Sequence, residues 1–308
     1  MNQITNTILM VRPAAFGFNE ETAANNAFQV KNESLSAEEI QQSALQEFDT
    51  FVNKLSAIGV EVIVVEDSAE PHTPDAIFPN NWISFHQDGL VVTYPMFSSI
   101  RRKERRPEII SDLMADFSVE TRIFFEDYER EEKYLEGTGS LVLDRENKVM
   151  YACLSPRTDR ALTEELAERL DYKAVIFTAV DEEGQEIYHT NVMMALGETF
   201  AIICLDVIVD IMERQEVIEV LEDSGKEIIE ISIDQMMQFA GNMLQVRGQD
   251  SSYLVMSQAA YDSLDEEQVE EIKQHTKILS SPIPTIEELG GGSVRCMMAE
   301  VFLPKLNA

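Results

Sequence analysis

One pattern of apolar and polar positions recurs five times along the chain. Each repeat starts at a turn of Gly, Asn or Ser that leads into an apolar strand, and a second strand, an amphipathic helix and a third strand follow. Successive repeats are 58, 52, 51 and 51 residues apart, as measured between Asn81, Gly139, Asn191, Asn242 and Ser293. A fixed period of this size is typical of architectures in which each unit covers its neighbour.

The first four repeats are each complete along the sequence. Their strands are expected at 80–86, 89–95 and 121–128, at 139–144, 148–155 and 173–180, at 191–197, 199–209 and 227–232, and at 242–248, 252–258 and 277–282. Their helices are expected at 106–117, 158–170, 210–225 and 263–275. Thr158 or Asp159 is the expected N-cap of the second helix.

The fifth repeat joins the two ends of the chain. It begins with the strand 294–304 and is completed by strand 7–13, helix 36–59 and strand 60–67. The pattern predicts an α/β fold, a five-bladed α/β propeller of five ββαβ modules around a pseudo-fivefold axis. We expect one domain over 1–308, because splitting the ring would expose apolar faces. The five turns should then converge on the axis.

Composition narrows the range of partners. The 308 residues are 44% hydrophobic, enough for a substantial core, and 56 acidic against 24 basic residues give a net charge of −32. This charge disfavours nucleic acids and anionic membranes. No apolar run reaches the roughly 18 residues of a membrane span, and the first residues lack the basic flank and apolar core of a signal peptide. We therefore expect a cytoplasmic protein.

The three cysteines suit neither a disulfide framework nor a metal site, because they are odd in number and widely spaced. Cys153 and Cys204 lie in apolar strands, whereas Cys296 follows the glycine run "GGGS". The four histidines show no metal-ligand spacing, and no phosphate-binding glycine motif is present. We expect no metal and no organic cofactor.

Convergence of the turns would gather chemically active side chains. The candidates are Asn80, Asn81, Glu136, His189, Asn191, Asn242 and Cys296. A thiol, an imidazole and a carboxylate fit the nucleophile, base and orienting group of covalent catalysis. Singly, each has an ordinary alternative: a buried thiol, a structural histidine, a turn carboxylate. Their coincidence at equivalent repeat positions favours an active site.

Several motifs carry a family resemblance over essentially the whole chain. "EGTG", "HTN" and "GGGSVRCM", in that order, resemble the guanidino-group-modifying enzyme superfamily, the pentein fold of arginine deiminases, dimethylargininases and amidinotransferases. "PDAIFPNNWISFH" and "YPMFSSIRRKERRPE" are similar to the branch of citrulline utilisation hydrolases. "EGTG" departs from the common EGGD pattern, because Gly139 stands where an aspartate is often found. Dimers are common in this superfamily, so a homodimer is the candidate assembly.

The resemblance implies a role for each candidate. Cys296 would be the nucleophile, His189 the general acid and then base, and Glu136 the carboxylate that orients the imidazole or binds substrate nitrogens. The implied substrate-binding residues are Asn81, Asn191, Asp75, Phe78, Arg101 and Arg157. The two arginines would pair with the carboxylate of an amino acid, with Arg102 less favoured than its neighbour.

Two departures bear on the substrate. Deiminases carry aspartates that grip the guanidinium where this chain has Asn81 and Asn191. An amide offers a donor and an acceptor and suits a neutral ureido group, so the sequence favours citrulline, cleaved to ornithine, ammonia and carbon dioxide. An arginine deiminase or dimethylargininase-type hydrolase and an amidinotransferase stay open as alternatives, and a non-catalytic pentein binding module is disfavoured by the triad. The segment 14–36 is a candidate lid or interface.

Overall fold

The computed structural model describes residues 2–32 and 34–306, and its strands form five separate three-stranded sheets. In each sheet the middle strand runs antiparallel to the first and parallel to the third. Four sheets are β3 (Ile83–Phe85), β4 (Leu90–Thr93) and β5 (Thr121–Phe124); β6 (Val142–Asp144), β7 (Val149–Leu154) and β8 (Lys173–Thr178); β9 (Met194–Leu196), β10 (Phe200–Ile203) and β11 (Glu227–Glu230); and β12 (Leu244–Arg247), β13 (Ser252–Ser257) and β14 (Lys277–Ser281).

The fifth sheet contains both ends of the described chain. β15 (Ala299–Glu300) pairs antiparallel with β1 (Thr7–Arg12), which pairs parallel with β2 (Glu61–Glu66). All five ββαβ units that the pattern predicts are present, so the predicted α/β class is confirmed. That 1–308 acts as one catalytic domain stays a prediction, and residues 1, 33, 307 and 308 within that range lie outside the described residues.

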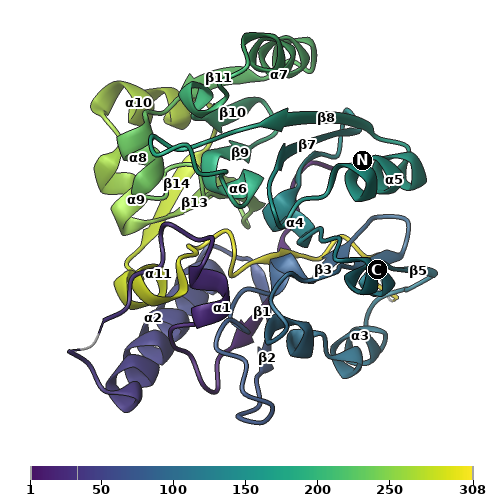
Figure 1. Cartoon of the computed structure of the whole chain (residues 1–308), viewed down its shortest axis with the longest axis vertical. Coiled ribbons are helices and arrows are strands. Elements are labelled where there is room, and N and C mark those ends of the chain that lie inside the picture. The colour runs from purple at the N-terminus through teal and green to yellow at the C-terminus, as the bar shows by residue number, and fades with distance from the viewer. Residues whose placement is uncertain (1, 33, 307–308) are drawn as a thin grey trace.

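A helix joins the parallel pair of every sheet. These helices are α3 (Pro107–Leu113), α5 (Arg160–Leu170), α7 (Ile211–Asp223), α10 (Glu266–His275) and α2 (Ala37–Ala57). They lie around the rim of the molecule in Figure 1, in the circular order of the modules. Asp159 is the N-cap of α5, and Ser36 and Glu39 form a capping box at α2.

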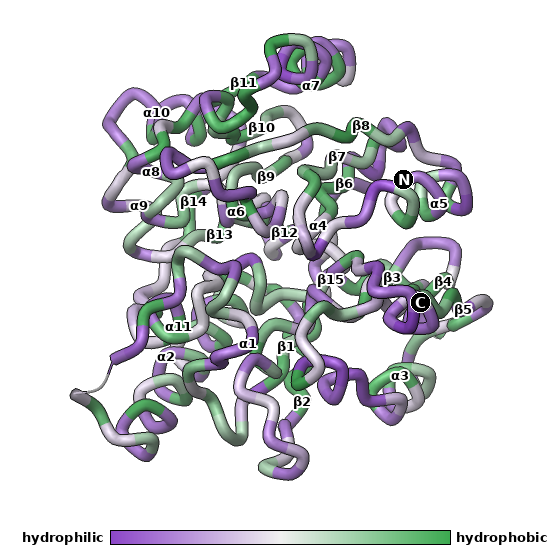
Figure 2. The backbone as a smooth tube through the Cα atoms, viewed as in Figure 1, coloured by the Kyte–Doolittle hydropathy of each residue, from purple (hydrophilic) through white to green (hydrophobic). Residues whose placement is uncertain are grey.

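Buried apolar clusters fill the space between the sheets and these helices. Figure 2 shows hydrophobic residues concentrated in the strands and hydrophilic ones on the outer turns. Several predicted strands are longer than the observed ones. The run 294–304 contains only β15 (Ala299–Glu300), and the runs 80–86, 139–144 and 191–197 begin as short helical turns. The apolar run 199–209 leaves β10 after Ile203 and turns at Leu205–Val207, and the run 121–128 leaves β5 after Phe124. Leu205, Val207 and Phe125 are buried although they lie in turns, so apolar character alone does not separate strand from turn.

Short helical turns precede three first strands and lie near the centre of Figure 1. They are η1 (Pro79–Asn81) before β3, α4 (Gly137–Ser140) before β6 and α6 (Thr190–Met193) before β9, and α4 contacts both others. A Cβ on Gly137 would lie 2.3 Å from the Asn80 carbonyl oxygen, so glycine is required for this approach.

The remaining short helices are α1 (Glu20–Ala23), η2 (Arg101–Glu104), η3 (Glu126–Glu131), η4 (Leu205–Val207), α8 (Ile233–Met237), α9 (Gln258–Ser263) and α11 (Pro284–Gly290). Over residues 2–32 and 34–306, no helix combines the length and apolarity needed to cross a bilayer.

Candidate active site

The starts of the modules enclose a small cavity. It is lined by Thr22, Asn26, Asp75, Phe78, Asn81, Arg101, Arg157, Tyr188, His189, Gly290, Gly291, Gly292 and Cys296. Two further candidates adjoin it, because Glu136 is hydrogen-bonded to His189 and Asn191 to Cys296. Asn242 adjoins it as well, with Nδ2 3.3 Å from Cys296 Sγ, so ten of the eleven residues that the sequence selects lie at one place. Asn80 is buried in η1 and does not line the cavity. The cavity is narrow and partly open to solvent.

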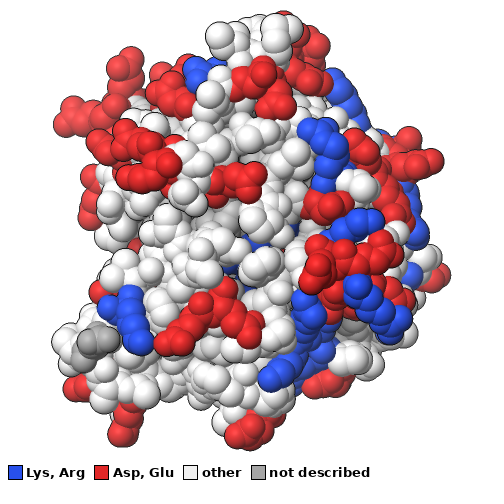
Figure 3. All heavy atoms as spheres, in the orientation of Figure 1, with Lys and Arg blue, Asp and Glu red and all other residues white. Residues whose placement is uncertain are grey.

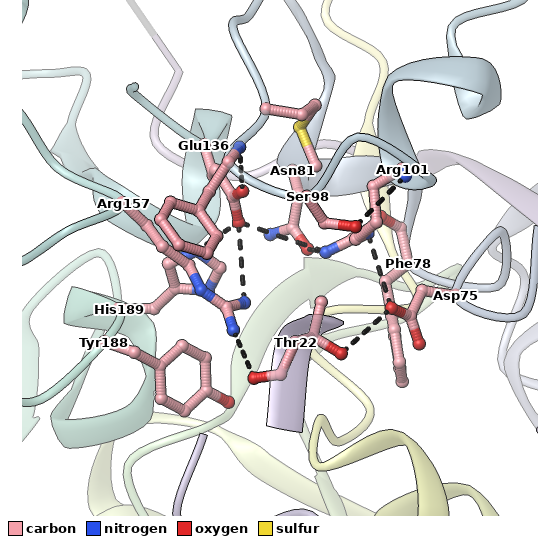
Figure 4. A network of polar contacts seen from close by, with 12 residues as sticks. Thr22, Asp75, Phe78, Asn81, Ser98, Arg101, Glu136, Arg157, Tyr188 and His189 are labelled. Carbon is pink, nitrogen blue, oxygen red and sulfur yellow. Dashed lines mark hydrogen bonds and ion pairs between the residues drawn. The ribbon is translucent and has the colours of Figure 1, made fainter. Parts of the chain in front are cut away.

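Glu136 and His189 form a buried hydrogen-bonded pair at the centre of this site (Figure 4). Each residue immediately precedes a one-turn helix, α4 or α6, which fixes its backbone. Glu136 Oε2 lies 2.8 Å from His189 Nε2, and Glu136 Oε1 accepts the Phe97 N–H at 2.9 Å. Both side chains are almost fully buried. The carboxylate thus holds one edge of the imidazole.

Burial and neighbouring charges set the protonation of this pair. Burial by itself raises the pKa of Glu136, but Arg157, His189 and Arg101 together lower that pKa to about 2. Burial lowers the pKa of His189 to about 4, although Glu136 opposes the shift. At neutral pH the pair is a carboxylate and a neutral imidazole. Nε2 then donates its proton to Glu136, and Nδ1 keeps a lone pair for proton transfer.

Cys296 lies in the turn before β15 and is buried. Its Sγ accepts hydrogen bonds from two side-chain amides, Asn242 Nδ2 at 3.3 Å and Asn191 Nδ2 at 3.5 Å. Burial raises the pKa of Cys153 to about 12 and that of Cys204 to about 11. Those two stay protonated thiols at neutral pH. Of the three cysteines, Cys296 is the one that lines the cavity.

The glycine run brings its backbone close to aromatic and polar neighbours. A Cβ on Gly290 or Gly292 would lie 2.8 or 3.1 Å from Phe78 Cζ. Gly291 has a φ of +60°, and its carbonyl oxygen accepts the Tyr188 hydroxyl at 2.6 Å and Asn26 Nδ2 at 3.1 Å. The glycines therefore allow the loop to form one wall of the cavity.

Gly139 keeps open the space between two site residues. A Cβ at this position would lie 2.4 Å from Asn81 Nδ2 and 2.8 Å from both Nδ1 and Cε1 of His189. An aspartate could not occupy the position without displacing them. Glycine at this position, where the EGGD pattern has an aspartate, therefore leaves room for the side chains of Asn81 and His189.

Arg101 is bonded to the protein through all three guanidinium nitrogens, and Figure 4 shows its side chain directed toward Asn81. Nε and Nη2 each donate to Glu104 at 3.0 Å, Nη1 donates to Asn81 Oδ1 at 2.8 Å, and Nη2 also reaches the Phe78 carbonyl oxygen at 3.2 Å. It orients the Asn81 amide and does not present an open fork to a substrate carboxylate. The sequence reasoning missed Glu104, whose pKa is raised to about 7 by burial. Its only signal is the three-residue spacing from Arg101.

Arg157 connects the site to the segment 14–36. Its guanidinium lies over the Tyr188 ring, 4.9 Å from the centroid, and donates to the Thr22 carbonyl oxygen at 2.9 Å and to Asn25 Oδ1 at 3.0 Å. Nη1 lies 3.7 Å from Glu136 Oε2. Arg102 instead donates to the Met96 carbonyl oxygen at 3.0 Å and does not line the cavity.

Asp75 makes a second connection to the same segment. It accepts hydrogen bonds from Asn19 Nδ2 at 2.8 Å and from Thr22 Oγ1 at 3.4 Å, and it lies 3.8 Å from Arg101 Nε. Burial raises the pKa of Asp75 despite the arginines. The sequence named the segment but not these contacts, for which its run of Asn and Thr residues was the only signal.

Three buried polar atoms at the site have no hydrogen-bond partner among residues 2–32 and 34–306. They are Asp75 Oδ1, Asn81 Nδ2 and Asn191 Oδ1. An unpaired buried polar atom costs about 1–3 kcal/mol. The site therefore offers a donor and two acceptors that a bound polar group can satisfy.

Figure 3 shows mainly uncharged residues around the hollow near the centre of this face, with separate acidic clusters farther out and a few basic atoms in the hollow. In the described part of the chain, no group of three or more His, Cys, Asp or Glu is arranged to hold a metal ion.

A protein-family model matches residues 12–303, nearly the whole chain, and describes eukaryotic N,N-dimethylarginine dimethylhydrolases. The chain belongs to this family. It is thus homologous to hydrolases that act on guanidino C–N bonds, and the expected guanidino-modifying superfamily is confirmed. No curated protein sequence matches the chain.

Solved structures of the same fold include two forms of ArgZ, an arginine dihydrolase of the cyanobacterial ornithine–ammonia cycle. Its product-bound N-terminal domain has a TM-score of 0.75 at 19% identity, with 98% of this chain and 99% of that domain covered. Apo ArgZ gives 0.75 at 18%, with 97% of this chain covered, and this chain spans 41% of its length. A dimethylarginine dimethylaminohydrolase variant in an adduct with S-methyl-L-thiocitrulline gives 0.63 at 13%, with 96% and 99% covered.

Proposed function

We propose that this protein hydrolyses the ureido group of citrulline to ornithine, ammonia and carbon dioxide, with Cys296 as the nucleophile. The observation that carries the proposal is the unpaired pair of amide atoms at the site, the donor Asn81 Nδ2 and the acceptor Asn191 Oδ1. A ureido group has a carbonyl oxygen and N–H groups, and can satisfy both atoms. A guanidinium carries donors alone and would leave the Asn81 N–H facing another donor.

The reaction proceeds in two steps. Cys296 Sγ bonds to the ureido carbon, and His189 Nδ1 takes the thiol proton and passes it to the departing δ-nitrogen. The C–N bond breaks, ornithine leaves, and an S-carbamoyl Cys296 is formed. A water molecule, deprotonated by His189, then attacks the carbamoyl carbon and releases the sulfur. The carbamate decomposes to ammonia and carbon dioxide, so one water is consumed per citrulline.

Glu136 supports both proton transfers. Its carboxylate accepts the Nε2 proton at 2.8 Å and stabilises the imidazolium that forms when Nδ1 is protonated. Thr22 and Asn26 line the narrow cavity, so we expect the segment that carries them to adjust when citrulline binds.

Arginine dihydrolysis is a second candidate, favoured by a different observation. The solved structures with a TM-score of 0.75 include an arginine dihydrolase. The site also holds more carboxylates than a neutral ligand needs, namely Asp75, Glu104 and Glu136 beside Arg101 and Arg157. The unpaired Asp75 Oδ1 would accept from a guanidinium N–H. This route consumes two waters and passes through citrulline, giving ornithine, two ammonia and carbon dioxide.

Product stoichiometry distinguishes these activities. The protein is incubated with citrulline, arginine or dimethylarginine, and ornithine, citrulline, ammonia and dimethylamine are measured. Citrulline hydrolysis gives one ammonia per ornithine and a higher kcat/KM on citrulline than on arginine. Arginine dihydrolysis gives two ammonia per ornithine from arginine. A deiminase accumulates citrulline, a dimethylargininase releases dimethylamine, and an amidinotransferase forms ornithine from arginine only with an added amine such as glycine.

The matched control is Cys296→Ser, which keeps the size of the side chain and removes the thiol. We expect it to lose at least about 10³-fold in kcat/KM. No ornithine from citrulline at any pH between 6 and 9 would contradict the proposal. We include in it a cytoplasmic location, as expected from the sequence, and a homodimer, which light scattering would test.

A further inference from the structure

Two side-chain amides contact the sulfur of Cys296 from separate modules. Asn242, in the turn before β12, places Nδ2 3.3 Å from Sγ, and Asn191, in α6, places Nδ2 3.5 Å from it. Both asparagines are about 1% exposed. Within the described residues, these are the amide groups that donate to this sulfur.

The Asn242 amide is fixed in one orientation. Its Oδ1 accepts the backbone N–H of Arg295 at 3.1 Å, and its Nδ2 also donates to the backbone oxygen of Asn191 at 2.9 Å. A backbone N–H can only donate and a carbonyl oxygen can only accept, so a flipped amide would lose both bonds. Gly241 allows this segment to approach α6 closely, because a Cβ there would lie 2.2 Å from the Val192 oxygen. The NH₂ group is therefore the nearer end of the amide to Sγ, at 3.3 Å, while the thiol can donate to Oδ1 at 3.8 Å; once the sulfur is deprotonated, only the NH₂ contact remains favourable.

Among the described residues, the charged and titratable groups around the thiol include no free cation that could stabilise a thiolate, so amide N–H donors matter here. The charged and titratable groups are Asp75, Arg101, Glu136, Arg157, Tyr188 and His189. Both arginines are engaged by carboxylates, and the imidazole is neutral. A buried thiolate needs hydrogen-bond donors or a nearby cation to form at neutral pH.

We propose that Asn242 is a catalytic residue that, together with Asn191, stabilises the deprotonated sulfur of Cys296. The inference rests on the proposed function only in taking Cys296 as the nucleophile. The two N–H groups lower the free energy of the thiolate before attack. They do so again when the covalent adduct releases the sulfur.

The test measures thiolate absorbance near 240 nm against pH, as the difference between the protein and its Cys296→Ser variant. Cys153 and Cys204 do not interfere, because burial raises their pKa values to about 12 and 11. Asn242→Asp keeps the size of the side chain and the acceptor for the Arg295 N–H, but it turns an oxygen toward Sγ. We expect the midpoint of the titration to rise by roughly two pH units.

The matched control is Gln245→Glu, the same amide-to-acid change three residues along the segment. Gln245 Oε1 accepts the Glu198 N–H at 2.7 Å, which a carboxylate preserves, and the side chain lines a different cavity. We expect its midpoint to match that of the unchanged protein. An equal shift in both variants would overturn the inference, because the effect would then be one of general charge.

An unchanged midpoint in folded Asn242→Asp, verified by circular dichroism, would also overturn the inference. If this variant does not fold, Asn191→Asp takes its place, and the same two outcomes decide. The titration needs no substrate. A shifted midpoint in a protein that does not cleave citrulline would therefore refute the proposed function and leave the role of Asn242 standing.

Discussion

Replacing Gly139 by alanine tests whether the space between Asn81 and His189 is fixed. The added Cβ would lie 2.4 Å from Asn81 Nδ2 and 2.8 Å from His189 Nδ1, whereas unstrained contacts of this kind need about 3.5 Å. The overlap is about 1 Å. Neither neighbour can retreat freely, because Arg101 holds Asn81 Oδ1 at 2.8 Å and Glu136 holds His189 Nε2 at 2.8 Å.

The structure gives the size of the expected effect. A displacement of about 1 Å in a catalytic group costs about 10²-fold in rate, or about 2.7 kcal/mol in the activation free energy. Overpacking of a buried position costs about 1–3 kcal/mol in the free energy of unfolding. We therefore expect Gly139→Ala to fold with a lowered Tm and to lose about 10²-fold in kcat/KM.

The assay measures ornithine release for kcat/KM and thermal unfolding for stability. Gly17→Ala is the matched control, because a Cβ at Gly17 would meet no described heavy atom within 4 Å. We expect this control to keep both values. Full activity in Gly139→Ala would refute the reasoning, and so would an equal loss in the control.

Two further predictions concern charge at the site. Asn81→Asp places a carboxylate where the donor amide lies, so we expect the ratio of kcat/KM on arginine to that on citrulline to rise by roughly tenfold or more in paired assays; an unchanged ratio would count against the amide argument. His189 should titrate at about 4 in NMR of its Cε1–H, assigned with His189→Asn, and a midpoint near 6.5 would show that burial does not govern it. Between pH 6.5 and 4, His189 binds a proton in the unfolded chain but not in the folded chain. The histidine therefore lowers the free energy of unfolding as the pH falls. Denaturant titrations of the unchanged protein and of His189→Asn would measure this difference.

The fold was predictable because each module repeats the same local requirements. A turn residue, two short apolar runs and an amphipathic helix recur at nearly constant spacing, and the expected helices 36–59 and 158–170 agree closely with α2 and α5. The lengths of some strands were not predictable, since buried turns such as Leu205–Val207 are as apolar as strands. Convergence of Cys296, His189 and Glu136 followed from pseudo-symmetry without any knowledge of contacts.

The orientation of polar groups was beyond the reach of the sequence. A guanidinium suits a carboxylate, which made Arg101 a candidate for binding the substrate, but the carboxylate that it meets is that of Glu104. Residue type cannot distinguish an internal carboxylate from one on a ligand. Because Glu104 holds two edges of the guanidinium, Nη1 is aimed at Asn81 Oδ1, and Asn81 Nδ2 is left as the unpaired donor. A carboxylate outside the lining of the cavity thus sets the hydrogen-bonding group that a ureido oxygen would meet.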